Sequence, residues 1–71
     1  VGDPVDLADV EAGDLVFFST VGSGPSHVGI AVGNGQFVHA PSSRGWVRTE
    51  RLDGSYWRQR FVGAKRIAER R

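Results

Sequence analysis

The sequence predicts a small, curled antiparallel β-sheet of about five short strands with little helix. Three observations lead to this prediction. The apolar segments, such as "DLVFF" and "HVGIAV", are short, and glycine-rich or asparagine-rich turn signals separate them. One segment alternates strictly between large apolar residues and small or polar ones, which is the period of a strand. A chain of 71 residues holds at most one small domain, in which roughly 60% of the unfolded surface is buried.

The first strand is predicted at residues 14–18, "DLVFF", where consecutive apolar residues are typical of a strand buried on both faces. Acidic residues mixed with spaced apolar ones in residues 6–14 indicate a turn or one turn of helix before it. Residues 19–26, "STVGSGPS", have the composition of a loop. The alternating segment at residues 27–32, "HVGIAV", is the second predicted strand.

Three more strands are predicted after the glycine turn "GNG". Residues 53–60, "DGSYWRQR", indicate a turn followed by a short aromatic segment, and "PSSRG" indicates a loop. The tail at residues 68–71 is expected to be disordered. The three strands are expected at residues 36–40, 46–50 and 61–67.

Both histidines of the chain, His27 and His39, lie on the predicted hairpin, and its turn decides whether they share a face. A two-residue turn at 34–35 places them on opposite faces. A three-residue turn at 33–35 makes Gly29 face His39, so that His27 becomes the diagonal neighbour of His39 at about 7–8 Å. Glycine at both ends of the turn favours the second arrangement.

A histidine pair on one face can supply a general base and a residue that orients it. Gly29 and Ala31 continue the same face and leave space there for a docked catalytic element. The alternative interpretation is a pair of ordinary surface histidines at strand ends. Ser26 adjoins His27 but points to the opposite face of the strand, and the other serines occupy turn-like segments. A serine nucleophile is therefore not expected.

Composition excludes several other classes of function. The chain has no cysteine, so it forms neither a disulfide nor a thiolate zinc site, and its two histidines make a poor metal inventory. No apolar run approaches the roughly 18 residues of a membrane helix. Residues 1–14 carry five acidic side chains and no basic one, and residues 48–71 carry eight basic against three acidic. Because aromatic and basic residues do not alternate along one face, we expect no nucleic-acid partner.

Three motifs in combination resemble the NlpC family of cell-wall peptidases. They are "GDLVFF", "HVGIAVGNGQFVHAP" and "YWRQRFVGAKRI", in this order and at this spacing, and the resemblance covers residues 1–67. It implies an α+β papain-like fold, of which this chain is the C-terminal, antiparallel β-sheet half. The missing half is then helical and carries a nucleophilic cysteine at a helix N-terminus.

The resemblance also implies roles and a location. His27 matches the general base and His39 the residue that orients it. Family members hydrolyse peptide bonds in peptidoglycan stems, often after D-glutamate, and need no metal or cofactor. A secreted or cell-envelope protein is therefore expected. Arg44 and Trp46 fall in a loop that resembles a rim of the cleft, where the family pattern fixes no role, and they are candidates for substrate binding. Apart from the resemblance, Trp57 is a further candidate for lining the substrate groove.

This chain departs from the family pattern at two points. Ala31 replaces an aromatic residue common in relatives, which is expected to widen the floor of the cleft. The family's cysteine is expected to lie upstream of Val1, so the 71 residues alone are expected to be inactive. The same absence leaves a second function class open, a non-catalytic β-module that binds a wall peptide or a protein. Alone, the chain is expected to expose an apolar patch, to dimerise or to swap elements.

Overall fold

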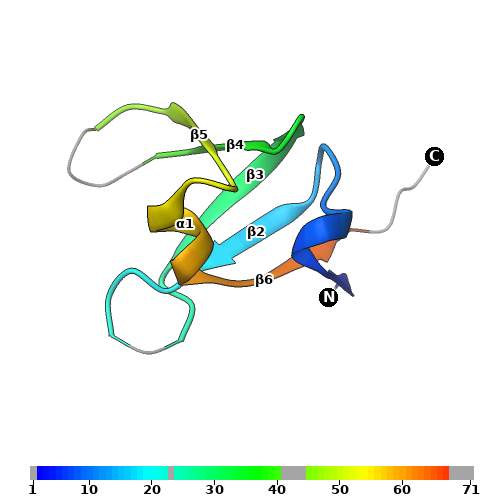
Figure 1. Ribbon diagram of the computed structural model, residues 1–71, viewed down its shortest axis with the longest axis horizontal. Coiled ribbons are helices and arrows are strands. Elements are labelled where there is room, and N and C mark those ends of the chain that lie inside the picture. Colours follow the sequence, from blue (N-terminus) through cyan, green and yellow to red (C-terminus); the bar gives the residue numbers. More distant parts are fainter. Residues whose placement is uncertain (1, 23, 41–44, 68–71) are drawn as a thin grey trace.

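The computed structural model describes residues 2–22, 24–40 and 45–67, which form one six-stranded antiparallel sheet (Figure 1). Neighbouring strands follow the order β1-β6-β2-β3-β4-β5. A single turn of 3-10 helix, η1 (Leu7–Asp9), and one short helix, α1 (Ser55–Arg60), complete the described structure. The strands are β1 (Asp3–Val5), β2 (Leu15–Phe18), β3 (His27–Gly33), β4 (Gln36–His39), β5 (Arg48–Arg51) and β6 (Phe61–Arg66).

The five predicted strands are present, and two expectations about the elements need correction. A sixth strand, β1, pairs with β6 at the edge of the sheet; its three residues contain a proline, a poor signal for a strand. Residues 55–60 of the predicted turn segment form α1. The sequence did not indicate this helix because six residues are too few to show a clear helical period. β6, the last strand along the chain, is an interior strand between β1 and β2. The prediction for residues 68–71 lies outside the described residues.

The β3–β4 hairpin combines a two-residue turn with a β-bulge. Asn34 and Gly35 both have positive φ, 57° and 74°, as a type I′ turn requires. The register then shifts between Ala31 and Gly33, so that Ala31 pairs with Phe37. The predicted three-residue turn is therefore wrong in detail, but the bulge restores the register that this turn would give. His27 and His39 consequently lie on one face.

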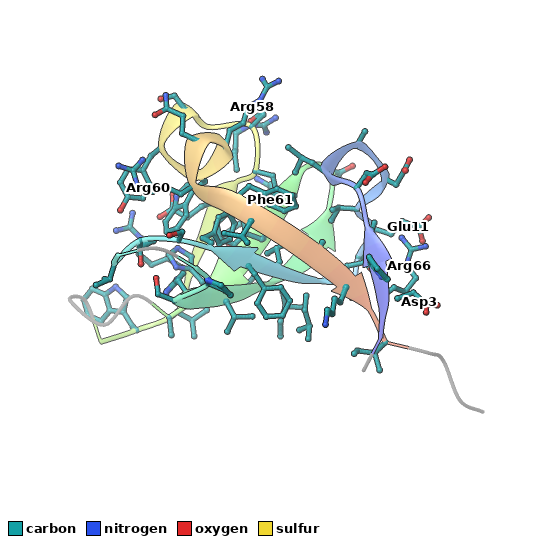
Figure 2. All side chains as sticks on the ribbon, turned by 90° about the horizontal axis from the view of Figure 1, so that it is seen from below. Asp3, Glu11, Arg58, Arg60, Phe61 and Arg66 are labelled. Atoms are coloured by element: carbon teal, nitrogen blue, oxygen red, sulfur yellow. The ribbon has the colours of Figure 1, made fainter. Side chains whose placement is uncertain are left out.

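The hydrophobic core lies on the face of the sheet that α1 and η1 cover. Figure 2 shows both of these elements on the same side of the strands. Phe18 and Phe37 are fully buried there, with ring centroids 4.9 Å apart. The Phe37 ring can pack directly on Gly29 because glycine has no side chain. A Cβ atom at this position would lie only 2.7 Å from a Phe37 ring carbon. The buried cluster comprises Val16, Phe18, Phe37, Leu52 and Ala64.

The opposite face of the sheet, called here the outer face, is apolar and open. Cross-strand pairing places Leu15 beside Ile30 and Phe17 beside Val28, and α1 and η1 lie on the other side (Figure 2). Ile30 is 51% exposed. The predicted burial of residues 14–18 on both faces is therefore correct only for the core face, where Val16 and Phe18 are 0% exposed. The apolar residues of the outer face are Leu15, Phe17, Val28, Ile30, Val32 and Val38, and Lys65 and Thr49 share this face.

An ion pair between a buried carboxylate and a partly exposed arginine joins the start of β2 to the end of β6. The side chain of Asp14 is 2% exposed and accepts hydrogen bonds from the Nε and Nη2 atoms of Arg66, at 2.9 and 3.0 Å. It also accepts one from the backbone N–H of Glu11, in the turn before β2. Hydrogen bonding to Arg66 lowers the pKa of the Asp14 carboxyl. Asp14 thus stabilises the fold just before β2. The last residue of β2, Phe18, is the cross-strand partner of His27.

Candidate active site

The imidazoles of His27 and His39 are in direct contact across the β3–β4 hairpin. The Nε2 atom of His27 lies 2.8 Å from the Nδ1 atom of His39, a hydrogen-bond distance. The rings meet nearly edge-on, with an interplanar angle of 85°. His27 begins β3 and His39 ends β4, so the pair sits at the end of the hairpin away from its turn. The spacing that predicted diagonal neighbours on one face is confirmed in this respect.

Trp57 of α1 closes over the histidine pair from the helix side. Its ring stacks on His27 with centroids 5.6 Å apart and an angle of 26°. It meets His39 edge-on at 4.8 Å. The same ring contacts Phe18 and Phe37, so the hydrophobic core and the histidine pair share one aromatic wall. The expected contact of Trp57 with substrate stays a prediction.

Burial changes the protonation of His27. Desolvation, and secondly the positive charge of a protonated His39, lower the pKa of His27 below its ordinary value. A lowered pKa favours the neutral imidazole at neutral pH, which is the form that can accept a proton. His39 is deeper in the structure, with its side chain 1% exposed. The buried member is therefore suited to hold the other ring in place.

A carboxylate that was not singled out from the sequence completes a row of three polar side chains. Glu50 of β5 places Oε2 3.5 Å from the Nε2 atom of His39. The same oxygen lies 3.6 Å from the Nε atom of Arg48. Glu50 pairs with Phe37 across β4 and β5, so it is the diagonal neighbour of His39. The alternation of residues 46–50 is enough to predict that Arg48 and Glu50 share a face of β5. Their position beside His39 depends on the register between β4 and β5, which the sequence alone does not show.

An open hollow adjoins His27 at the edge of the outer face. It is reached from solvent and includes residues of the loop before β3 as well as outer-face residues of two strands. His27 contributes to this hollow, while its side chain points to the core face, where it lies beside Phe18 and under Trp57. The hollow is lined by Phe17, Pro25, Ser26, His27, Val28 and Ala40.

The expected open floor beside the histidines is absent. Gly29 is buried beneath the Phe37 ring, and Ala31 is 2% exposed, four residues along β3 from His27. The reason is that the core side chains and α1 already occupy this face. Ala31 therefore does not widen a cleft in this chain, and the open apolar surface is the outer face instead.

The other candidate residues are not gathered at the histidine pair. Trp46 is 68% exposed and lies just before β5, so its expected role in substrate binding stays a prediction. The prediction for Arg44 lies outside the described residues. The hydroxyl of Ser26 accepts hydrogen bonds from the backbone N–H groups of Thr20 and Val21, which gives it a structural role in the loop.

Among residues 2–22, 24–40 and 45–67, no group of three histidine or acidic side chains is placed to hold a metal ion. In the same part of the chain, no helix has the length and apolar character needed to cross a membrane. The site offers the imidazoles of His27 and His39 and the carboxylate of Glu50, and the chain has no cysteine.

Comparison with known proteins identifies the family. The model of the NlpC/P60 family matches residues 1–66. The chain belongs to the NlpC/P60 family. This confirms the resemblance drawn from the three motifs, and a six-stranded antiparallel sheet with little helix is the part of that fold present here.

The curated relatives of this NlpC/P60 chain include peptidoglycan endopeptidases. It is 50% identical over 61 residues to the probable peptidoglycan endopeptidase LytE of Bacillus subtilis (strain 168), covering 86% of this chain and 18% of LytE. It is 46% identical over 69 residues to the probable endopeptidase NlpC of Escherichia coli (strain K12), covering 94% of this chain and 44% of that protein. The chain thus spans less than half the length of these relatives.

Solved structures of the NlpC/P60 family show the same arrangement of strands. An NlpC/P60 family protein from Bacillus cereus superposes with a TM-score of 0.79 at 31% identity. A lipoprotein-like member from Staphylococcus aureus superposes with a TM-score of 0.74 at 30% identity. Each alignment covers 93% of this chain and 22% of the other protein.

Proposed function

We propose that this chain is the sheet half of a cysteine endopeptidase that hydrolyses the stem peptides of peptidoglycan. The observation that carries the proposal is the 2.8 Å contact between His27 and His39 beside an open hollow, in a chain of the NlpC/P60 family. His27 acts as the general base, and His39 orients its ring. Family membership supports the substrate class, because relatives are named as peptidoglycan endopeptidases. A secreted or cell-envelope location follows from the same substrate.

The proposed reaction needs a nucleophile from outside these 71 residues. A cysteine thiol beside His27 transfers its proton to the free nitrogen of the imidazole, and the thiolate attacks the carbonyl carbon of the scissile peptide bond. The imidazolium then gives that proton to the leaving amine, leaving an acyl-enzyme. Water, deprotonated by the same imidazole, attacks the acyl-enzyme and releases the thiol. No metal or cofactor takes part in these steps.

The nucleophile is proposed to lie on a helical half that docks on the outer face. Three outer-face residues, Val28, Ile30 and Val32, are about half exposed, whereas the core face is already covered by α1 and η1. The hollow at His27 includes two outer-face residues, Phe17 and Val28. Because the side chain of His27 points to the core face, we propose that such a helix ends at the sheet edge beside His27, where the helix dipole and the imidazole both favour a thiolate.

The test uses a joined polypeptide, in which the segment encoded before Val1 is continuous with residues 1–71. We expect this segment to contain a cysteine and the joined polypeptide to cleave a muropeptide containing L-alanine and D-glutamate, with products identified by mass spectrometry. The 71-residue chain alone serves as the control and is expected to give no product, because it has no thiol.

A cysteine-free segment, or a joined polypeptide that binds the muropeptide without cleaving it, would contradict the peptidase proposal. That result would instead support a non-catalytic β-module that holds a wall peptide. The same products formed by a joined polypeptide with its cysteine replaced by alanine would show that the nucleophile is another group.

A further inference from the structure

We propose that Glu50 is a positioning residue that fixes which nitrogens of His39 and His27 carry protons. The proposal rests on the arrangement of three side chains in one row, from Glu50 through His39 to His27. For its effect on turnover it also rests on the proposed peptidase function. Glu50 itself touches neither the free nitrogen of His27 nor the hollow beside it.

The first step concerns His39. Its Nε2 atom faces Oε2 of Glu50 at 3.5 Å, and a carboxylate offers only acceptor sites. The arrangement is satisfied when Nε2 of His39 carries the proton and donates it toward Glu50. The distance is long for a hydrogen bond, and such contacts in catalytic sites commonly shorten when substrate is bound.

The second step concerns His27, whose tautomer is determined by its hydrogen bond with His39. When Nε2 of His39 is protonated, its Nδ1 atom has a lone pair and accepts a hydrogen bond from Nε2–H of His27, over the observed 2.8 Å. His27 must then carry its proton on Nε2, which leaves Nδ1 unprotonated. The free Nδ1 is the atom that can accept a proton from a nucleophile.

The opposite tautomers would leave the row without a free base. If Nδ1 of His39 carried the proton, it would donate a hydrogen bond to Nε2 of His27. Neutral His27 would then carry its own proton on Nδ1, which could no longer act as a base. The buried Nε2 lone pair of His39 would then face the carboxylate of Glu50, which repels it. A single negative charge at Glu50 thus favours the tautomer of His27 that is competent for catalysis.

Arg48 also lies against Glu50, with its Nε atom 3.6 Å from Oε2 of the carboxylate. Replacing Arg48 therefore offers a matched control. Arg48→Gln removes the ion pair but keeps the acceptor for His39. If Glu50 mattered only through its ion pair with Arg48, Arg48→Gln and Glu50→Gln would have the same effect.

The experiment records the imidazole nitrogen signals of the joined polypeptide labelled with 15N-histidine, at a pH of about 8, above the ordinary imidazole pKa of about 6.5. We expect Nε2 to be protonated and Nδ1 to be unprotonated in both His27 and His39. In Glu50→Gln, whose amide can donate as well as accept, the signals of both rings are expected to move toward averaged values of two tautomers. Arg48→Gln and Glu11→Gln, the latter on an exposed residue of the distant turn, are expected to keep the wild-type pattern.

Turnover gives a second readout. Glu50→Gln is expected to lower kcat on the stem peptide on the order of tenfold, with KM nearly unchanged, since a hydrogen bond to a charged group is removed at a position away from the substrate. A protonated Nδ1 in wild-type His39, or wild-type signals in Glu50→Gln, would overturn the proposal whatever the enzyme does. Because the NMR readout needs neither substrate nor nucleophile, its failure is distinct from a failure of the peptidase function.

Discussion

Replacing His27 with alanine in the joined polypeptide is expected to abolish hydrolysis of the stem peptide. The physical reason is that His27 is the base facing the hollow, so no group remains to take the thiol proton or to protonate the leaving amine. The expected loss in kcat/KM is on the order of 10⁴-fold, the upper end of the range for proton-transfer catalysis. The measurement is steady-state cleavage of a defined muropeptide.

His39→Ala is the matched comparison. It removes the group that orients His27 but leaves the base, so a smaller loss is expected, on the order of 10²-fold. Circular dichroism and thermal unfolding of each variant serve as the folding control, because both rings pack on Trp57. Equal and negligible losses in folded variants would place the catalytic site elsewhere.

The second large effect is expected on the outer face. Ile30→Asp should destabilise the joined polypeptide by about 3 kcal/mol or more, because an unpaired carboxylate would be buried beneath the docked helices and the apolar packing of the Ile30 side chain would be removed. In the 71-residue chain alone the same substitution should change stability little, since Ile30 is 51% exposed there. Urea unfolding of both forms measures the difference.

Val21→Asp provides the control for this prediction. Val21 is 75% exposed in the loop before β3, and the substitution introduces the same charge away from the outer face. It is expected to have little effect in either form. If Ile30→Asp is equally mild in the joined polypeptide, the outer face is not the docking surface. A stable dimer of the chain alone that Ile30→Asp dissociates would show that a second copy covers this face in the absence of the helical half.

The strands could be predicted because their signals are local. Alternation in "HVGIAV" and the glycine-rich turn after it predicted the position of the hairpin turn to within one residue. The register between β3 and β4 followed because one face of the hairpin must be buried. The combination of turn and bulge was missed because both solutions give the same pairing beyond Ala31. β1 and the position of β6 were missed for a different reason. Pairing between the two ends of the chain is a tertiary choice that no local pattern reports.

The site could be predicted only as far as the hairpin reaches. His27 and His39 are joined by one turn, so their spacing brought them together. Trp57 lies on α1 and Glu50 on β5. Their contacts with His39 depend on how α1 and β5 pack against the β3–β4 hairpin, which the sequence does not show. The expectation of an open floor at Gly29 failed because a missing side chain was interpreted as empty space. In the structure the ring of Phe37 fills that space.

The most direct test of the histidine pair as the activator of a thiol is the pH dependence of cysteine alkylation by iodoacetamide in the joined polypeptide. With His27 present, alkylation should follow an apparent thiol pKa well below the ordinary value of about 8.5, since the imidazolium stabilises the thiolate. In His27→Ala the apparent pKa should return toward that ordinary value. An identical pH profile for the wild type and His27→Ala would contradict the assignment of His27 as the base that activates the nucleophile.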